Sequence, residues 1–330
     1  MNSILGACIG DAAGATLEFY GKDISENIAL SAMKMPGGGK LGVGPGQITD
    51  DGELTLSLWS AIHTRNPSHG FPFDSVIKSY AVWYESCPFD MGRTCGLAFE
   101  LANDLCSNKS NNDITIKDIN IIKRNVWNAN KLSEANGALM RATAIATWIA
   151  KHTDIAAEVG AEFAMDDAEL SHPNQSCKET NAIYVYTLIN LLRGISPLDA
   201  LLYTSEFIQL NEISDTVRKW YFEDSLDITN INCTEKQGWV RWGFVMAFYF
   251  LRHSYITYEE AIKQTLMKGG DTDTNAAIVG GLVASYQSIP EYMKIPVIEF
   301  DCTRKPIIHR GWNVRPIDYS LRHIVKNLIK

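Results

Sequence analysis

Paired cysteines and an excess of positive charge are both missing from this 330-residue sequence. Its seven cysteines are scattered and odd in number, with no Cys-x-x-Cys pair and no Cys/His cluster of zinc spacing. They are typical of reduced, mostly buried thiols and favour a cytoplasmic location. The chain has 30 basic and 38 acidic residues, which gives a formal net charge of −8. Binding of nucleic acid through a broad basic face is therefore disfavoured.

Long apolar runs are also missing. The longest, 242–251 and 276–286, are shorter than the roughly 18 to 20 residues that a membrane-spanning helix needs. Residues 1–15 are apolar, but they lack a basic start and contain Asp11, so we expect no signal peptide. Hydrophobic residues still make up 46% of the chain, enough for a sizeable core. We expect a soluble globular protein with no membrane partner.

The dominant period of the sequence is helical, and no alternating run is long enough to predict a sheet. Apolar residues recur at three- and four-residue steps over 54–62 and 76–83. Residues 138–150 are apolar almost all round, which predicts a helix buried at the centre. Further helices are expected at 154–170, 176–192, 198–210, 239–253, 259–267, 274–286 and 318–329, with prolines between the runs. The sequence predicts an all-α fold in a single domain, 1–330, with an exposed loop at 107–113.

One acidic segment, Thr49-Asp50-Asp51, follows the glycine-rich stretch 37–46 and precedes a predicted helix. Taken alone, its acids have a simple structural explanation. Asp50 and Glu53 fit a capping box, and acids at this position complement the helix dipole. The glycine-rich stretch is not a phosphate-binding loop, because Leu41 stands where a Ser or Thr should bind magnesium.

A second acidic segment, 269–275, also places a glycine pair ahead of a helix. Its Asp271-x-Asp273-x-Asn275 pattern opens like an EF-hand loop, but Ala276 replaces the required Gly and Leu282 replaces the bidentate Glu. A phosphatase of the haloacid-dehalogenase type is also disfavoured. Its Asp-x-Asp-x-Thr motif ends differently here and should follow an apolar strand.

Together the two segments offer only hard oxygen ligands, with no nearby His or Cys that would favour zinc. Face to face, they could ligate two octahedral Mg²⁺ or Mn²⁺ ions and leave positions open for water and substrate. The candidate metal ligands are Thr49, Asp50, Asp51, Asp271, Asp273 and Thr274. The alternative is that the two segments never meet.

Three glycines spaced by four residues mark the N-terminal helix. Gly6, Gly10 and Gly14 form one stripe, which lets another helix pack closely. Asp11 and Glu18 lie two turns apart beside that stripe. This pattern indicates a helix that carries carboxylates into the core, although an ordinary amphipathic helix would place such acids in water.

At these residues the chain resembles the ADP-ribosylglycohydrolases. The shared motifs, in the family's order, are Gly10-Asp11-Ala12 to Glu18, Pro45 to Asp51, Asp90 to Cys95, Asn136 to Arg141, and Gly269 to Thr274. The resemblance implies a compact orthogonal multi-helix bundle with a dinuclear magnesium or manganese site in a central cleft. It also implies removal of ADP-ribose from ADP-ribosylated protein, with arginine as the favoured acceptor.

The resemblance also implies roles for single residues. It gives the six candidate ligands as holders of the two cations and places Glu18 close to them. It gives Asp90 as a catalytic acid or base, and Asn136, Gly137 and His172 as residues that hold ADP-ribose. For His172, a polar residue satisfied at a helix end is an equal alternative. Residues 107–132 form a polar insertion, so the resemblance assigns no residue that selects the acceptor.

The acids suit glycosidic chemistry. Cleaving the C1″ bond of the ribose passes through a cationic, oxocarbenium-like sugar, which nearby carboxylates stabilise. Three alternatives stay open: a non-catalytic ADP-ribose-binding relative, a hydrolase of another linkage such as serine or a free ADP-ribose ester, and a phosphatase. The complete acid set argues against a relative that has lost turnover.

Overall fold

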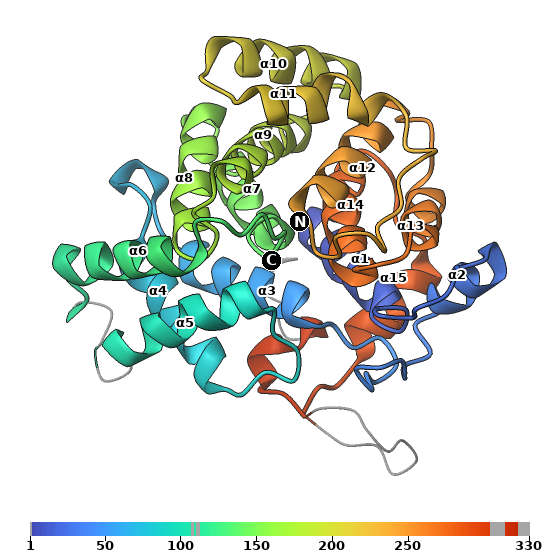
Figure 1. The fold of residues 1–330 in the computed structure, drawn as a ribbon, viewed down its shortest axis with the longest axis horizontal. Helices are drawn as coiled ribbons and strands as arrows, with labels where there is room; N and C mark the ends of the chain where they lie inside the picture. The colour runs from blue at the N-terminus through green and yellow to red at the C-terminus, as the bar shows by residue number, and fades with distance from the viewer. Residues whose placement is uncertain (1, 107–108, 110–112, 304–313, 323–330) are drawn as a thin grey trace.

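The protein is described here by a computed structural model that covers residues 2–106, 109, 113–303 and 314–322. Within these residues the chain forms α-helices joined by loops and short 3₁₀ turns, with no β-strand. The helices follow one another around the molecule, so that α14, near the end of the chain, lies beside α1 (Figure 1). The predicted all-α fold is confirmed.

The α-helices are α1 (Asn2–Gly14), α2 (Glu26–Ala32), α3 (Asp50–Ile62), α4 (Phe73–Glu85), α5 (Arg93–Cys106), α6 (Ile116–Asn130), α7 (Thr143–Ala150), α8 (Ala157–Glu169), α9 (Gln175–Leu192), α10 (Pro197–Leu210), α11 (Asp215–Phe222), α12 (Val240–Arg252), α13 (Tyr258–Met267), α14 (Thr272–Val283) and α15 (Glu291–Glu299). The 3₁₀ turns are η1 (Pro67–His69), η3 (Leu139–Arg141), η4 (Asp224–Leu226) and η5 (Ile317–Tyr319).

The packing of α1 against α14 forms the centre of the fold, and every residue of α14 is buried. The predicted glycine stripe makes this contact. A β-carbon at Gly10 would overlap the carbonyl oxygen of Ala276, and one at Gly14 would lie 2.5 Å from Cα of Asp273. Because no side chain separates the two backbones, the acids at the start of α14 lie against α1.

One predicted helix, 138–150, is wrong in its first turn. Residues 139–141 form the 3₁₀ turn η3, and α7 begins only at Thr143. The side chain of Arg141 explains the difference, since its Nη1 donates to the carbonyl oxygen of Gly137 at 2.8 Å. In an α-helix that oxygen would accept the backbone N–H of Arg141.

The remaining differences concern the polar and terminal segments. The helical pattern did not predict α2, α5, α11 or α15. Of the helix expected over 318–329, the structure describes only the start, where η5 lies, and 323–329 are outside the described residues. Most of the predicted loop 107–113 is also outside them.

Two expectations from composition can be compared with the structure. All seven cysteines are free, and all except Cys87 are buried, as predicted. In the part of the chain that is described, no helix combines the length and the apolar character that a bilayer span requires.

The glycine stripe gives the first testable prediction. Gly10→Ala should destabilise the fold by about 1 to 3 kcal/mol or more, because the added methyl group must push α1 and α14 apart. The control is Gly96→Ala in α5, where the new β-carbon meets only the flexible side chain of Met91. That control should be neutral or slightly stabilising. Urea unfolding of both variants measures the effect. Equal free energies of unfolding for the two variants would show that α1 and α14 are not in close contact at Gly10.

Candidate metal centre

The two acidic segments meet. Asp50 and Asp51 lie in the first turn of α3, and Asp273 lies in the first turn of α14. The hydroxyl of Thr274 donates to Oδ2 of Asp51 at 3.2 Å, and the hydroxyl of Thr49 reaches the same oxygen at 3.1 Å. The structure thus joins two helix starts that are more than 200 residues apart in sequence.

The carboxylates form two groups that share one residue. One oxygen from each of Asp11, Asp51 and Asp273 lies within 4.8 Å of the others, and the same holds for Glu18, Asp271 and Asp273. Such spacing lets each group surround one cation. Within the described residues, Oδ1 of Asp51 and Oε2 of Glu18 are buried without a hydrogen-bond partner. Buried oxygens without a partner are the donors that a hard cation needs, so the residues fit a magnesium or manganese pair.

Burial and mutual repulsion change the acidity of the group. Burial, together with the charges of Asp90 and Asp271, raises the pKa of Glu18 to about 9. Burial also raises the pKa values of Asp50, Asp51 and Asp273 well above their ordinary range, with neighbouring carboxylates adding to the effect. The carboxylates therefore cannot all be charged at neutral pH unless positive charge joins them.

Asp11 is a site residue to which the sequence analysis assigned no role. Its carboxylate accepts the backbone N–H groups of Thr49 at 3.0 Å and Gly52 at 2.8 Å, and the hydroxyl of Thr49 at 2.9 Å. Burial raises its pKa to about 7, although these hydrogen bonds oppose the rise. An acid on α1 thus caps α3, so neither Asp50 nor Asp51 is needed as the cap of that helix. The Gly10-Asp11-Ala12 motif beside the glycine stripe was the available signal.

The capping box proposed for Asp50 and Glu53 is wrong. Glu53 turns away from the helix start and forms a buried ion pair with Arg315, whose Nε and Nη2 lie 2.7 Å from its two oxygens. Nε1 of Trp83 also donates to Glu53, at 2.8 Å. Arg315 donates further to the carbonyl and hydroxyl of Ser86, so the pair ties the C-terminal segment to the helix that carries Asp50 and Asp51.

Asp90 and Asn136 lie at the edge of the centre. Asp90 is partly exposed, and its pKa is raised to about 6 by burial and by the charge of Asp271. Two residues further on, the backbone N–H of Gly92 donates to Asp50 at 3.3 Å. Asn136 donates to Oδ2 of Asp271 at 2.8 Å and so positions that carboxylate. Both predicted residues therefore adjoin the acidic groups.

Gly137 and His172 lie behind the acidic groups, in the next layer of residues. His172 has no exposed surface, and burial together with Arg141 lowers its pKa to about 3, so its ring is neutral. Its Nδ1 lies 2.9 Å from the hydroxyl of Ser171, while its Nε2 has no partner among the described residues. A β-carbon on Gly137 would lie 2.9 Å from the ring. His172 thus packs beneath Gly137 and does not line an open surface.

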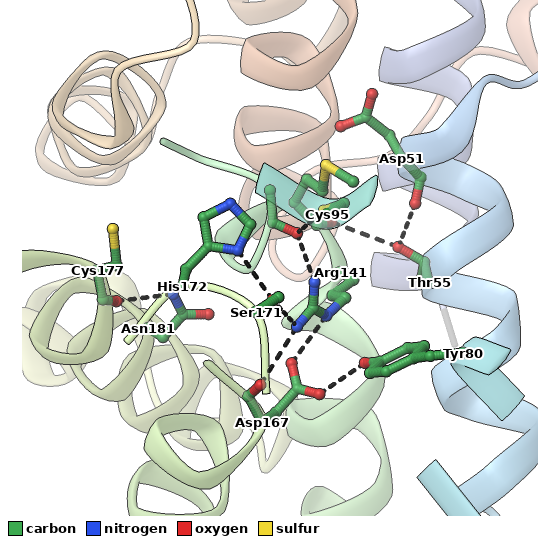
Figure 2. Close-up of polar contacts among 12 residues, drawn as sticks. Asp51, Thr55, Tyr80, Cys95, Arg141, Asp167, Ser171, His172, Cys177 and Asn181 are labelled. Atoms are coloured by element: carbon green, nitrogen blue, oxygen red, sulfur yellow. Dashed lines mark hydrogen bonds and ion pairs between the residues drawn. The ribbon is translucent and has the colours of Figure 1, made fainter. Parts of the chain in front are cut away.

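Arg141 holds this layer together. Figure 2 shows its guanidinium bonded to Asp167, with Ser171 and His172 beside it. Both members of the ion pair are buried, with Nε and Oδ2 2.9 Å apart, and Nη2 donates to the Ser171 hydroxyl at 2.8 Å. Tyr80 donates to the other oxygen of Asp167 at 2.6 Å. Because Arg141 also binds the carbonyl of Gly137, this network fixes the loop that carries Asn136.

A solved structure titled an ADP-ribosylglycohydrolase-related protein complex has the same fold. The match has a TM-score of 0.66 at 21% identity and covers 88% of this chain and 89% of that one. A family model for ADP-ribosylglycohydrolase matches residues 1–309. The chain therefore belongs to the ADP-ribosylglycohydrolase family, a class of hydrolases that remove ADP-ribose.

Two relatives support this membership. A protein of Acanthamoeba polyphaga mimivirus that bears the name of an ADP-ribosyl glycohydrolase is 27% identical over 332 aligned positions, which cover 92% of each chain. The ADP-ribosyl-[dinitrogen reductase] glycohydrolase of Rhodospirillum rubrum is 38% identical over 96 residues, 29% of this chain and 31% of that one.

The acidic groups predict that divalent cations stabilise the protein. Mg²⁺ or Mn²⁺ should raise the melting temperature, and at about 100 times the dissociation constant the gain corresponds to about 2.7 kcal/mol. Asp273→Asn changes the residue that both groups share, so the gain should disappear, while the cation-free variant should melt at or above the wild-type temperature. Asp215→Asn at the exposed start of α11 is the matched control and should keep the gain. A gain that persists in Asp273→Asn contradicts the assignment.

The Glu53–Arg315 pair gives a separate prediction for stability. Arg315→Met leaves a buried carboxylate unpaired and should cost about 3 to 5 kcal/mol of unfolding free energy, which adding Glu53→Gln should partly restore. Lys294→Met removes an exposed ion pair with Glu291 and should cost about 1 kcal/mol or less. Urea unfolding of the three variants tests this. Equal losses in Arg315→Met and Lys294→Met would contradict it.

Proposed function

We propose that the protein is a metal-dependent hydrolase that removes ADP-ribose from modified arginine side chains of proteins, using two Mg²⁺ or Mn²⁺ ions. The observation that carries this proposal is the pair of carboxylate groups that share Asp273. A single cation would need only one such group. The single domain over 1–330 and the cytoplasmic location stay predictions.

The proposed ligands come from both helix starts: Thr49, Asp50, Asp51, Asp271, Asp273 and Thr274. When bound, the two cations would supply positive charge to these carboxylates and Lewis-acid polarisation of water and of the ribose hydroxyls. Asp11 belongs to one of the two carboxylate groups, but its oxygens already accept hydrogen bonds from Thr49 and Gly52, so we assign it a positioning role. Asn136 is a second positioning residue, because it donates to Asp271.

Glu18 is the proposed catalytic carboxylate. It lies in the group with Asp271 and Asp273, and one of its oxygens has no partner among the described residues. In the hydrolysis, the oxygen of water bonds to C1″, the bond from C1″ to the arginine nitrogen breaks, and a proton passes to that nitrogen. Glu18 accepts a proton from the attacking water and offsets the positive charge that develops on the sugar. Asp90 is the next carboxylate in line.

The nucleotide part of the substrate is proposed to lie beside the loops 90–94 and 133–137. These loops are joined by the hydroxyls of Thr94 and Ser133, 2.9 Å apart. Asn136 and Gly137 contribute polar and backbone groups there, and α5 begins there with the N–H donors that a diphosphate binds. His172 is proposed to support Gly137 from behind.

The comparisons leave the acceptor linkage open. The Rhodospirillum rubrum relative is named for dinitrogen reductase, and that substrate belongs to that protein. A direct test measures free ADP-ribose released from arginine-linked and serine-linked substrates, with Mg²⁺, with Mn²⁺ and with a chelator. Release from arginine that stops with chelator supports the proposal. Release of phosphate, release from serine alone, or binding without release would favour the respective alternatives.

Glu18→Gln tests the catalytic role. The substitution keeps size and shape but cannot accept a proton, so kcat should fall by about 10²- to 10⁴-fold. The affinity for ADP-ribose, measured by calorimetry with Mg²⁺, should change by less than about tenfold. Asp273→Asn is the contrasting variant, since losing a ligand should weaken binding and turnover together. A near-normal kcat in Glu18→Gln would transfer the role to Asp90.

A further inference from the structure

A small pocket lies next to the carboxylates, between the turn that follows Glu18 and the segments that contain Gln237 and Gly270. We infer that it binds the guanidinium side chain of the modified arginine, an assignment that rests on the proposed function. The pocket has a volume of about 190 Å³ and is lined by residues 19–24, Thr234, Gln237, Gly269 and Gly270.

The pocket adjoins the acidic group by chain connectivity. Phe19 directly follows Glu18, and Gly270 directly precedes Asp271, and both acids belong to the same group. The loop that contains Gln237 also lies close to Asp271. A β-carbon on Gly238, the neighbour of Gln237, would lie 3.4 Å from Oδ2 of Asp271. A group seated in the pocket is therefore next to the carboxylates that must surround C1″.

The pocket is of a size that suits the arginine side chain, which is the smaller part of the substrate. Pockets that enclose drug-sized ligands usually measure about 300 to 1,000 Å³, and ADP-ribose is a ligand of that size. A volume of about 190 Å³ suits one amino-acid side chain. The nucleotide is proposed to lie elsewhere, beside the loops 90–94 and 133–137.

The lining suits a planar cation. Phe19 and Tyr20 are 42% and 39% exposed, and Lys22, Asp23 and Gln237 are the charged and amide residues that also line the pocket. Guanidinium groups stack on aromatic faces and pair with carboxylates, and they lose less hydration than an ammonium group does. Nζ of Lys40 lies 5.9 Å from the centre of the Phe19 ring, so one cation already approaches this ring. A serine acceptor would leave these groups unused.

The turn after Glu18 is held in an unusual conformation. Phe19 has a φ of 54°, a left-handed value that is unfavourable for a bulky residue, and Gly21 follows with 72°. The backbone of Gly39 packs against this turn, where a β-carbon would lie 2.7 Å from the carbonyl oxygen of Thr16. The backbone of the turn that carries Phe19 is thus packed against the glycine-rich segment.

Kinetics with ADP-ribosylagmatine, in which ADP-ribose is joined to a guanidinium, test the assignment. Phe19→Leu keeps an apolar side chain but removes the aromatic face, and should raise KM about three- to thirtyfold. Asp23→Asn keeps the shape and should raise KM about tenfold. In both variants the inhibition constant of free ADP-ribose should stay within about twofold of wild type, because the nucleotide lies elsewhere.

Tyr255→Leu is the matched control. Tyr255 is an aromatic residue that is 80% exposed, and it lies beyond the end of α12 that is far from Gln237. This variant should keep the wild-type KM, and melting temperatures of all variants should agree within a few degrees. An unchanged KM in Phe19→Leu and Asp23→Asn overturns the assignment. Equal weakening of ADP-ribose overturns it too, since the pocket would then hold the nucleotide.

A binding measurement separates the pocket from the proposed function. Calorimetric titration of agmatine into wild-type protein saturated with ADP-ribose and Mg²⁺ should show binding that Phe19→Leu weakens. If wild-type protein releases no ADP-ribose from ADP-ribosylagmatine but binds agmatine in this way, the proposed function fails and the pocket assignment stands. If it hydrolyses the substrate but the variants bind agmatine as the wild type does, the pocket assignment fails alone.

Discussion

The close approach of α1 and α14 determines where the carboxylates of this protein meet. With glycine at the contact positions of α1, the two backbones touch, and Asp11 on α1 comes within reach of Asp273 on α14. Asp11 then binds the first backbone N–H groups of α3 and sets the position of Asp50 and Asp51. A wider separation between α1 and α14 would move the carboxylates of both acidic groups apart. The contact between these two helices is therefore needed for the site as well as for the core.

The chemistry of the centre follows from crowding negative charge inside the fold. Burial and mutual repulsion oppose ionisation of the acids there, and nearby positive charge would favour their ionised forms. The two buried arginines of the described residues do not supply it, because Arg141 pairs with Asp167 and Arg315 pairs with Glu53. These pairs instead brace the centre from outside. One holds the loop of Asn136 and Gly137, and the other holds the first turn of α3. The carboxylates at the centre stay available for external cations.

Much of this arrangement was predictable from the sequence, for physical reasons that differ between residues. The helical period gave the strongly apolar helices, and the donor chemistry of the two acidic segments predicted their meeting. The segment α5 was missed because few of its residues are buried. The role of Asp11 was missed because its partners, the N–H groups of Thr49 and Gly52, come from a distant part of the chain. The tertiary pairing of Glu53 with Arg315 overrode a capping box that local sequence favoured.

The central claim is that the starts of α3 and α14 share a pair of divalent cations. Anomalous diffraction from crystals grown with Mn²⁺ tests it most directly, because manganese can be located independently of the protein. The account predicts two manganese peaks at about 2.0 to 2.2 Å from carboxylate oxygens, one beside Asp51 and Asp273 and the other beside Asp271 and Asp273. No manganese peak between the two helix starts, at a concentration that saturates activity, would contradict it.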